Sequence, residues 1–418
     1  MALASLDISD DNPPAFIAGD WIGKNKIYDS TTLPLYVLQA RTDAFAIPED
    51  VQAALLPLPT LPVIDFIDQS LPTKDPPTLL GIKPKEWFSM HGPTHGALEI
   101  LRHRPLPHVD VLRSLEEQAG QLWLDGMQSV RDPRYTGGEY FPLWVLTFWK
   151  EAAFVLDAQL EWEASGAWLT SVIRSCSDSN VIMELKAART RLSNLPWNGK
   201  ISAGLVPATE LTQLLGPRWV SGDLVDLMIQ NLPARFGSVT STGAMVFVAG
   251  TSTMVEIQRG FRNQCFGGKK LPLLHRFERG VRAKQYVRMV FPAFINSNHW
   301  IVFHVDTKNL ILEYGESIDC KTLTGGTNLP IAESLRDTGI APNPNALVKD
   351  VQRWLKSSFG RAFTFKGPTM AQNTQPDTHA CALFAVGAIA HAVFGQPLAP
   401  KRDAVHVHVR NALLVNRV

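Results

Sequence analysis

The chain has 418 residues, more than one hydrophobic core usually supports, so we expect two or three domains and exclude a miniprotein held together by disulfides. Apolar residues make up 45% and charged residues 19%, and 40 basic side chains stand against 39 acidic ones. This even balance is typical of a globular protein without a large field of one sign, and no nucleic-acid partner is expected from it.

Targeting signals and cysteines indicate the compartment. The N-terminus is acidic and interrupted by prolines, unlike a secretory signal. The most apolar stretch, residues 375–395, contains His391 and falls short of the ~20 apolar residues that a bilayer span needs, so no membrane crossing is expected. The four cysteines, with no C-x-x-C pair, favour neither a disulfide framework nor a zinc cage: Cys176, Cys265, Cys320 and Cys381. We expect an intracellular protein of the nucleus or cytoplasm.

The composition and the hydrophobic pattern of the first half of the chain change twice. Residues 1–108 are rich in proline, which excludes long helices and predicts a partly disordered lead-in. Residues 109–195 carry apolar side chains at helical spacing and form a helical region of unknown role. The stretch "NLPWNGKIS", residues 194–202, ends that pattern, and we place the start of the last domain, 196–418, there.

The second half alternates short strands with helices, which predicts an α+β domain with a central, largely antiparallel sheet. The predicted strands fall within residues 243–250, 285–294, 299–306, 309–315 and 361–367. The predicted helices fall within residues 223–232 and 345–359 and from about 380 to 394, where Gly395 and Pro397 end the last one.

Cys381 lies in the first turn of that last helix. The unpaired N–H groups and the positive end of the helix dipole favour a thiolate there, although a buried structural cysteine fits the same pattern. A nucleophilic cysteine needs a base and a group that orients the base, which can lie far away in the sequence.

His299 is the candidate base, because it follows a polar turn and opens a predicted strand. Glu316 ends the next strand, so a short turn around residues 306–309 would bring its carboxylate beside the imidazole. His304 fits a packed strand position instead. Gln375, six residues before Cys381, offers a side-chain amide that could, with the Cys381 N–H, hold an oxyanion.

The order of these residues resembles the sentrin-specific (SUMO) protease family, and in particular its divergent fungal members. The matching motifs are His299-Trp300, the turn Tyr314–Ser317, and a glutamine six positions before the cysteine. Residues 218–232, "RWVSGDLVDLMIQNL", are similar to the family's Trp-containing segment before its first helix. The resemblance covers roughly residues 200–418.

This resemblance implies a papain-superfamily cysteine peptidase domain that cleaves after the Gly-Gly tail of a ubiquitin-like modifier, most often SUMO. It implies a catalytic set of His299, Glu316, Cys381 and Gln375, and no cofactor. Trp219 and Trp300 would form the aromatic slot for the Gly-Gly tail, although core packing explains tryptophans equally well.

The chain departs from the family pattern at three places. Glu316 stands where the family has aspartate, and Ala380 and Ala382 flank the cysteine where many members have Asp and Gly. Gly222 stands where an acid often contacts the modifier, which makes recognition of SUMO itself less secure than the thiol chemistry. Two alternative functions therefore stay open: a catalytically silent module that binds a modifier, and an acyltransferase that reuses the same triad with acetyl-CoA.

Two histidine pairs are candidate metal ligands, and neither fits. His91 and His95 are separated by Gly92 and Pro93, which break the helix that the pair would need. His406 and His408 fall in a predicted terminal helix, where their side chains diverge. No metal site is expected.

Overall fold

The computed structural model describes residues 20–75, 83–94, 97–135, 137–201, 206–236, 246–263, 266, 271–295, 299–318, 344–375, 377 and 379–398. The chain divides into two compact units, one made of residues 1–61 and 65–160 and the other of residues 62–64 and 161–418. The long helix α6 (Val145–Ser175) contributes residues to both. The domain limits expected at residues 108 and 195 stay predictions.

The first unit combines short helices with a small sheet. Its elements are α1 (Leu35–Phe45), α2 (Glu49–Leu55), η1 (Pro84–Trp87), β1 (Phe88–Ser89), α4 (Ala97–Leu101), α5 (Val109–Leu124), β2 (Ser129–Arg131), β3 (Tyr140–Pro142) and the start of α6, while α3 (Val63–Ile67) lies at the division. The strands form an antiparallel sheet in the order β1-β2-β3. Helix α5 begins where the ring of His108 accepts a hydrogen bond from the Asp110 N–H.

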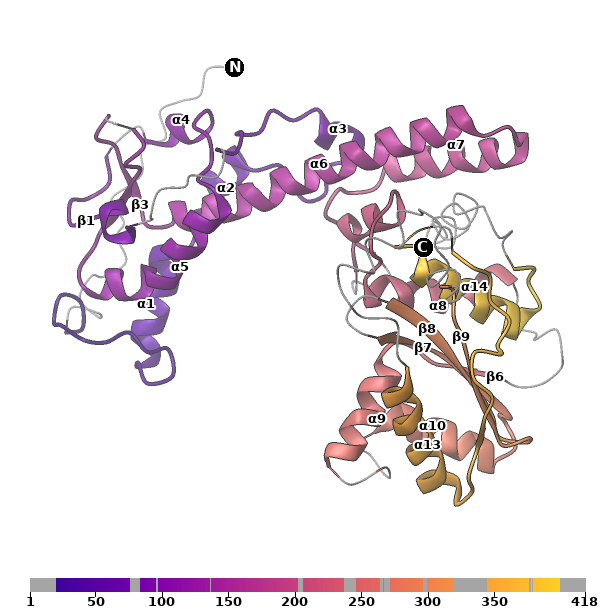
Figure 1. The fold of residues 1–418 in the computed structure, drawn as a ribbon. Coiled ribbons are helices and arrows are strands. Elements are labelled where there is room, and N and C mark those ends of the chain that lie inside the picture. The colour runs from indigo at the N-terminus through magenta and orange to yellow at the C-terminus, as the bar shows by residue number, and fades with distance from the viewer. Residues whose placement is uncertain are drawn as a thin grey trace, which may run out of the picture. The chain divides into compact units, whose positions relative to one another are not determined.

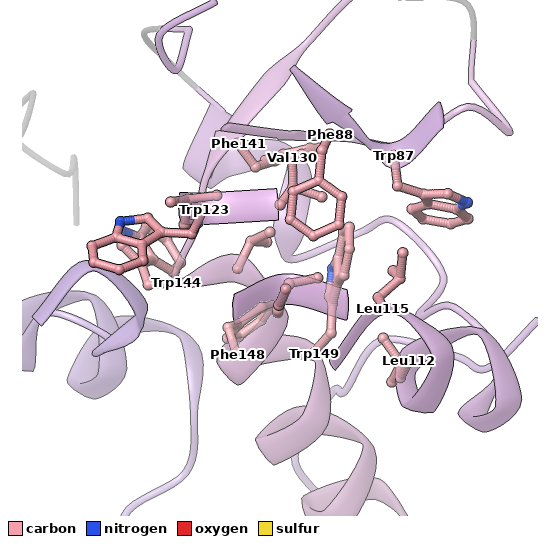
Figure 2. Close-up of a cluster of buried hydrophobic side chains, with 14 of the residues drawn as sticks. Trp87, Phe88, Leu112, Leu115, Trp123, Val130, Phe141, Trp144, Phe148 and Trp149 are labelled. Atoms are coloured by element: carbon pink, nitrogen blue, oxygen red, sulfur yellow. The ribbon is translucent and has the colours of Figure 1, made fainter. Parts of the chain in front are cut away.

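The core of this unit combines aromatic and aliphatic side chains (Figure 2). Trp149 of α6 lies at its centre, with ring centroids 6.1 Å from Trp87 and 6.0 Å from Phe141, both in edge-on geometry. Val37 of α1 and Val51 of α2 are buried in the same core. The proline-rich segment expected as a lead-in thus supplies short helices to a hydrophobic core.

The second unit is a mixed α+β domain, as expected. Its elements are the end of α6, α7 (Ser179–Ser193), β4 (Lys200–Ile201), β5 (Val206–Pro207), η2 (Ala208–Leu214), α8 (Gly222–Phe236), β6 (Val246–Val248), α9 (Ser252–Arg262), α10 (Pro272–Arg282), β7 (Arg288–Ile295), β8 (His299–Asp306), β9 (Ile311–Gly315), α13 (Asn345–Phe359), β10 (Thr364–Phe365) and α14 (Cys381–Phe394). Every strand and helix expected in residues 223–394 has a counterpart, while α9 and α10 were not anticipated.

The central sheet has the order β10-β9-β8-β7-β6. The three middle strands are antiparallel, and the two outer strands pair in parallel with their neighbours. Alternate side chains of β7 and β8, such as Phe291 and Phe303, belong to one core cluster together with side chains of α9, α10 and α13. The intervening Val290 and Val302 are buried outside that cluster, and α14 contacts both strands. Helices therefore cover both faces of the sheet (Figure 1).

Helix α14 ends as the sequence predicts. Gly395 has a left-handed backbone, with φ 66°, and its N–H binds the carbonyl of His391. None of the helices in the described part of the chain is both long and apolar enough to cross a membrane.

Candidate active site

The hairpin of β8 and β9 brings His299 and Glu316 together. In the antiparallel register Val302 lies opposite Gly315, so the first residue of β8 and the residue after β9 reach the same end of the hairpin. Nε2 of His299 lies 2.6 Å from Oε1 of Glu316. The same oxygen accepts the Ile318 N–H at 3.0 Å, which fixes the carboxylate toward the ring. The predicted proximity of this base and this acid is therefore present in the structure.

The turn between the two strands has a local cause. Oδ1 of Asp306 accepts the backbone N–H groups of Lys308 and Asn309 at 3.0 and 2.9 Å, an arrangement typical of an Asx turn. Leu310 follows with a positive φ of 55°. The sequence "DTKN" therefore closes the hairpin and sets its register, on which the pairing of His299 with Glu316 depends.

Cys381 is the first residue of α14, and its side chain is a free, buried thiol. The preceding turn is held by Asp377, whose Oδ1 accepts the N–H groups of His379 and Ala380 at 3.0 and 2.7 Å. Within the described part of the chain, no acceptor is hydrogen-bonded to the N–H of Cys381. That N–H stays available at the positive end of the helix dipole.

The imidazole of His299 is buried between the thiol and the carboxylate. Burial alone would lower its pKa, but the side chain of Cys381 and the hydrogen bond and charge of Glu316 outweigh burial and raise the pKa from 6.5 to about 9. Nδ1, the nitrogen not bound to Glu316, makes no hydrogen bond of good geometry to a described residue. The thiol thus acts on the ring from nearby without an aligned hydrogen bond, a common state of catalytic pairs without substrate.

Gln375 is buried and tied to the segment that carries the acid. Its N–H binds the Ser317 carbonyl at 2.8 Å, and its Oε1 accepts the Ser317 hydroxyl at 2.7 Å. Its Nε2 donates one hydrogen bond to the Asp377 carbonyl at 2.6 Å. An amide nitrogen carries two hydrogens, so one donor remains for another acceptor.

The two tryptophans differ in exposure. Trp300 is buried, and its indole N–H donates to the Val220 carbonyl at 3.2 Å. Trp219, the neighbour of Val220, is 48% exposed. Trp300 of β8 is thus packed against the segment before α8, whereas Trp219 of that segment offers an exposed aromatic ring.

The roles of two residues were not identified from the sequence. Phe294 lies opposite Trp300 in the β7–β8 register, with ring centroids 4.8 Å apart, and is 46% exposed. Ser317 orients Gln375. The strand period could have placed Phe294 across from Trp300, but the hydrogen bond from Ser317 joins segments 58 residues apart and leaves no sequence signal.

A second histidine–glutamate pair lies on the same hairpin. Nδ1 of His304 is 2.8 Å from Oε1 of Glu313, its register partner, and Thr369 binds the other carboxylate oxygen. This agrees with a strand position for His304. No cluster of metal-ligating side chains occurs among the described residues. Three of the histidines considered as metal ligands, His95, His406 and His408, lie outside the described residues.

Comparison with known proteins gives similarities of structure. The chain is similar to solved SUMO proteases. The protease domain of Ulp1 in complex with Smt3, the yeast orthologue of SUMO, is 14% identical, with a TM-score of 0.38 over 56% of this chain and 94% of that one. The Ulp1-like SUMO protease of Chaetomium thermophilum is 13% identical, with a TM-score of 0.36 over 57% and 88%.

The Xanthomonas campestris effector XopD, in a structure bound to ubiquitin, is 13% identical, with a TM-score of 0.29 over 47% of this chain and 92% of that one. No family model matches the chain, and no curated protein matches it.

Proposed function

We propose that the second unit is a cysteine peptidase that cleaves after the Gly-Gly tail of a ubiquitin-like modifier, with SUMO as the first candidate. The observation that carries this proposal is His299, which is bound to Glu316 at 2.6 Å and has its pKa raised to about 9 with Cys381 acting on it. A cysteine, a base and a group that orients the base are the parts that nucleophilic thiol catalysis needs.

The raised pKa of His299 makes the ring a proton donor. At neutral pH the imidazole is protonated, and its positive charge stabilises the thiolate, which is the form of a cysteine that acts as a nucleophile. The thiolate attacks the carbonyl carbon of the second glycine. The C–N bond then breaks to leave a thioester on Cys381, and the imidazolium gives its proton to the departing amine. The neutral imidazole then takes a proton from water, which attacks the thioester and releases the carboxylate and the thiolate.

The surroundings of the thiol fit a narrow substrate. The Cys381 side chain is fully buried, so residues that reach it must be slender, as two glycines are. Phe294 contacts the ring of the packed Trp300, and Trp219 precedes Val220, whose carbonyl binds the Trp300 indole. The exposed rings of Trp219 and Phe294 can hold an extended chain without side chains. The free N–H of Cys381 and the second hydrogen of Gln375 Nε2 are the donors for the oxyanion.

The test is labelling of the full chain with SUMO and ubiquitin that carry a cysteine-reactive group at the C-terminus. We expect a covalent adduct that Cys381→Ala abolishes and His299→Ala slows. Cys176→Ala is the matched control, because Cys176 is the other free cysteine of the described residues and should leave labelling unchanged. An adduct that persists in Cys381→Ala, or no adduct with any probe in a folded protein, would contradict the proposal.

A further inference from the structure

Three helices of the second unit carry a concentration of basic side chains that the chain as a whole lacks. Helices α9, α10 and α13 contain eight arginines and lysines and three acidic residues, whereas the whole chain has 40 basic and 39 acidic side chains. We call the eight the basic helical surface, and all are exposed: Arg259, Arg262, Arg276, Arg279, Arg282, Lys349, Arg353 and Lys356. The even balance of the whole chain therefore does not describe this region.

The basic side chains of the three helices face solvent on the same side of the domain. The inner faces of all three helices belong to one core cluster against the sheet, so their outer faces point away from it together (Figure 1). The helices also touch one another directly. The Glu256 carboxylate of α9 accepts the Leu273 N–H of α10 at 3.2 Å, and the Trp354 indole of α13 donates to Glu278 of α10 at 3.4 Å.

The acidic residues of these helices leave the positive charge largely uncompensated. Glu256 is engaged with the start of α10, and Glu278 is buried against Trp354 and Ser358. Only Asp350 of α13 remains, and it is half-buried. The ion pairs among the described residues of this unit involve other basic groups: Arg218, Arg288, His299, His304 and His379.

Helix-dipole compensation explains only part of this pattern. Five of the basic residues lie in last turns, where a positive charge stabilises the helix. Arg276, Lys349 and Arg353 do not. The guanidinium of Arg276 lies 5.3 Å from the centre of the Phe247 ring, and that of Arg353 lies 6.0 Å from the centre of the Phe261 ring. Stacking restricts both guanidinium groups, so less entropy is lost when they bind an anion.

We propose that the basic helical surface binds the phosphodiester backbone of nucleic acid without sequence preference. Six of its eight basic residues are arginines, whose planar forks match phosphate oxygens. The charges are spread over three helices, as a repeating array of phosphates requires, rather than gathered in one pocket. Of the large apolar side chains that are exposed in the described part of the chain, Val255 alone lies on these helices. The apolar anchors that a protein partner or a membrane would need are therefore missing there.

The test measures fluorescence anisotropy of labelled duplex DNA and single-stranded RNA of mixed sequence with the full chain, between about 50 and 200 mM salt. The variant Arg276→Gln/Lys349→Gln/Arg353→Gln should bind at least about tenfold more weakly at low salt. The logarithm of the affinity for duplex DNA falls linearly with the logarithm of the salt concentration, and the magnitude of this slope should decrease by about 0.9 for each phosphate that the variant no longer neutralises. The matched control is Arg174→Gln/Lys186→Gln/Arg189→Gln, which removes the same residue types from exposed positions of α6 and α7 and should bind normally.

The outcomes separate the possible partners. The proposal is supported if the protein binds unrelated sequences with equal affinity, if the first variant binds them more weakly or not at all, and if the control variant binds them normally. No binding at low salt, an equal loss of affinity in both variants, or binding only to phosphatidylserine vesicles or to polyglutamate overturns it. Carrying Cys381→Ala in every protein makes the result independent of the proposed peptidase activity. Circular dichroism verifies that each variant is folded.

Discussion

Nε2 of His299 lies 2.6 Å from Oε1 of Glu316, and the register of β8 against β9 joins these two residues across 17 positions of sequence. The residue before the acid is Gly315, which lies against Gln372. A Cβ on Gly315 would lie 2.3 Å from Oε1 of Gln372, so a side chain at position 315 would force that amide away from the end of β9. A register slip of one residue would turn Glu316 to the opposite face and separate the pair.

Replacing Glu316 tests its electrostatic role. Glu316→Gln keeps the shape of the side chain but removes the charge that supports the imidazolium, so the pKa of His299 should fall. We expect isopeptide hydrolysis by the wild type to decline as pH rises through about 9, where the ring loses the proton that the leaving amine needs, and to decline at lower pH in the variant. A pH profile of hydrolysis measures this shift. Identical profiles would contradict the role given to Glu316.

The raised pKa of His299 also predicts how the stability of the fold depends on pH. The folded pKa of His299, about 9, is above its ordinary value of 6.5, so the folded state binds the proton more tightly than the unfolded state. The resulting contribution, of the order of 3 kcal/mol, is fully present below pH 6.5 and is lost as pH rises toward 9. Urea unfolding at several pH values should show this loss in the wild type, and a smaller loss in Glu316→Gln. If the free energy of unfolding rose between pH 6.5 and 9, and by the same amount in the wild type and in Glu316→Gln, this prediction would be refuted.

The two tryptophans should respond differently to truncation. Trp300→Ala removes a buried indole and leaves the Val220 carbonyl unpaired, so we expect a loss of about 3–5 kcal/mol in the free energy of unfolding. Trp219→Ala removes a side chain that is 48% exposed and should change stability little while raising KM for a modifier substrate. Thermal melts and steady-state kinetics separate the two effects. A stable Trp219→Ala enzyme with unchanged KM would argue against the slot.

Gln375 should affect the rate of chemistry more than substrate binding. If its free amide hydrogen stabilises the oxyanion, Gln375→Ala should lower kcat by about 10²–10³ with little change in KM. Ser317→Ala frees the side-chain oxygen of Gln375 without removing the amide, so a smaller loss of kcat is expected. Single-turnover kinetics with a modifier fused to a fluorescent amine measure both. An equal rise of KM in both variants would instead indicate a purely structural role.

Local patterns in the sequence were enough to predict the strands of the central sheet and the helices α8, α13 and α14 of the second unit, but not α9 and α10. The alternation in residues 299–306 and the apolar run from Cys381 to Gly395 predict β8 and α14, because hydrophobic period and helix ends depend on neighbouring residues. The same patterns predict that His299 opens a strand and that Cys381 opens a helix. The polar turn at residues 306–309 predicts the hairpin that joins His299 to Glu316.

Other properties were decided by contacts between distant segments. Trp219 and Trp300 are the same residue type, yet packing against the start of α8 buries one and leaves the other exposed. Ser317 holds Gln375 because two loops far apart in sequence meet. The whole chain has 40 basic and 39 acidic residues, yet the fold brings eight exposed basic side chains together on α9, α10 and α13 and makes that surface mainly positive. Burial, loop contacts and charge segregation depend on which surfaces meet, and the tertiary structure sets them.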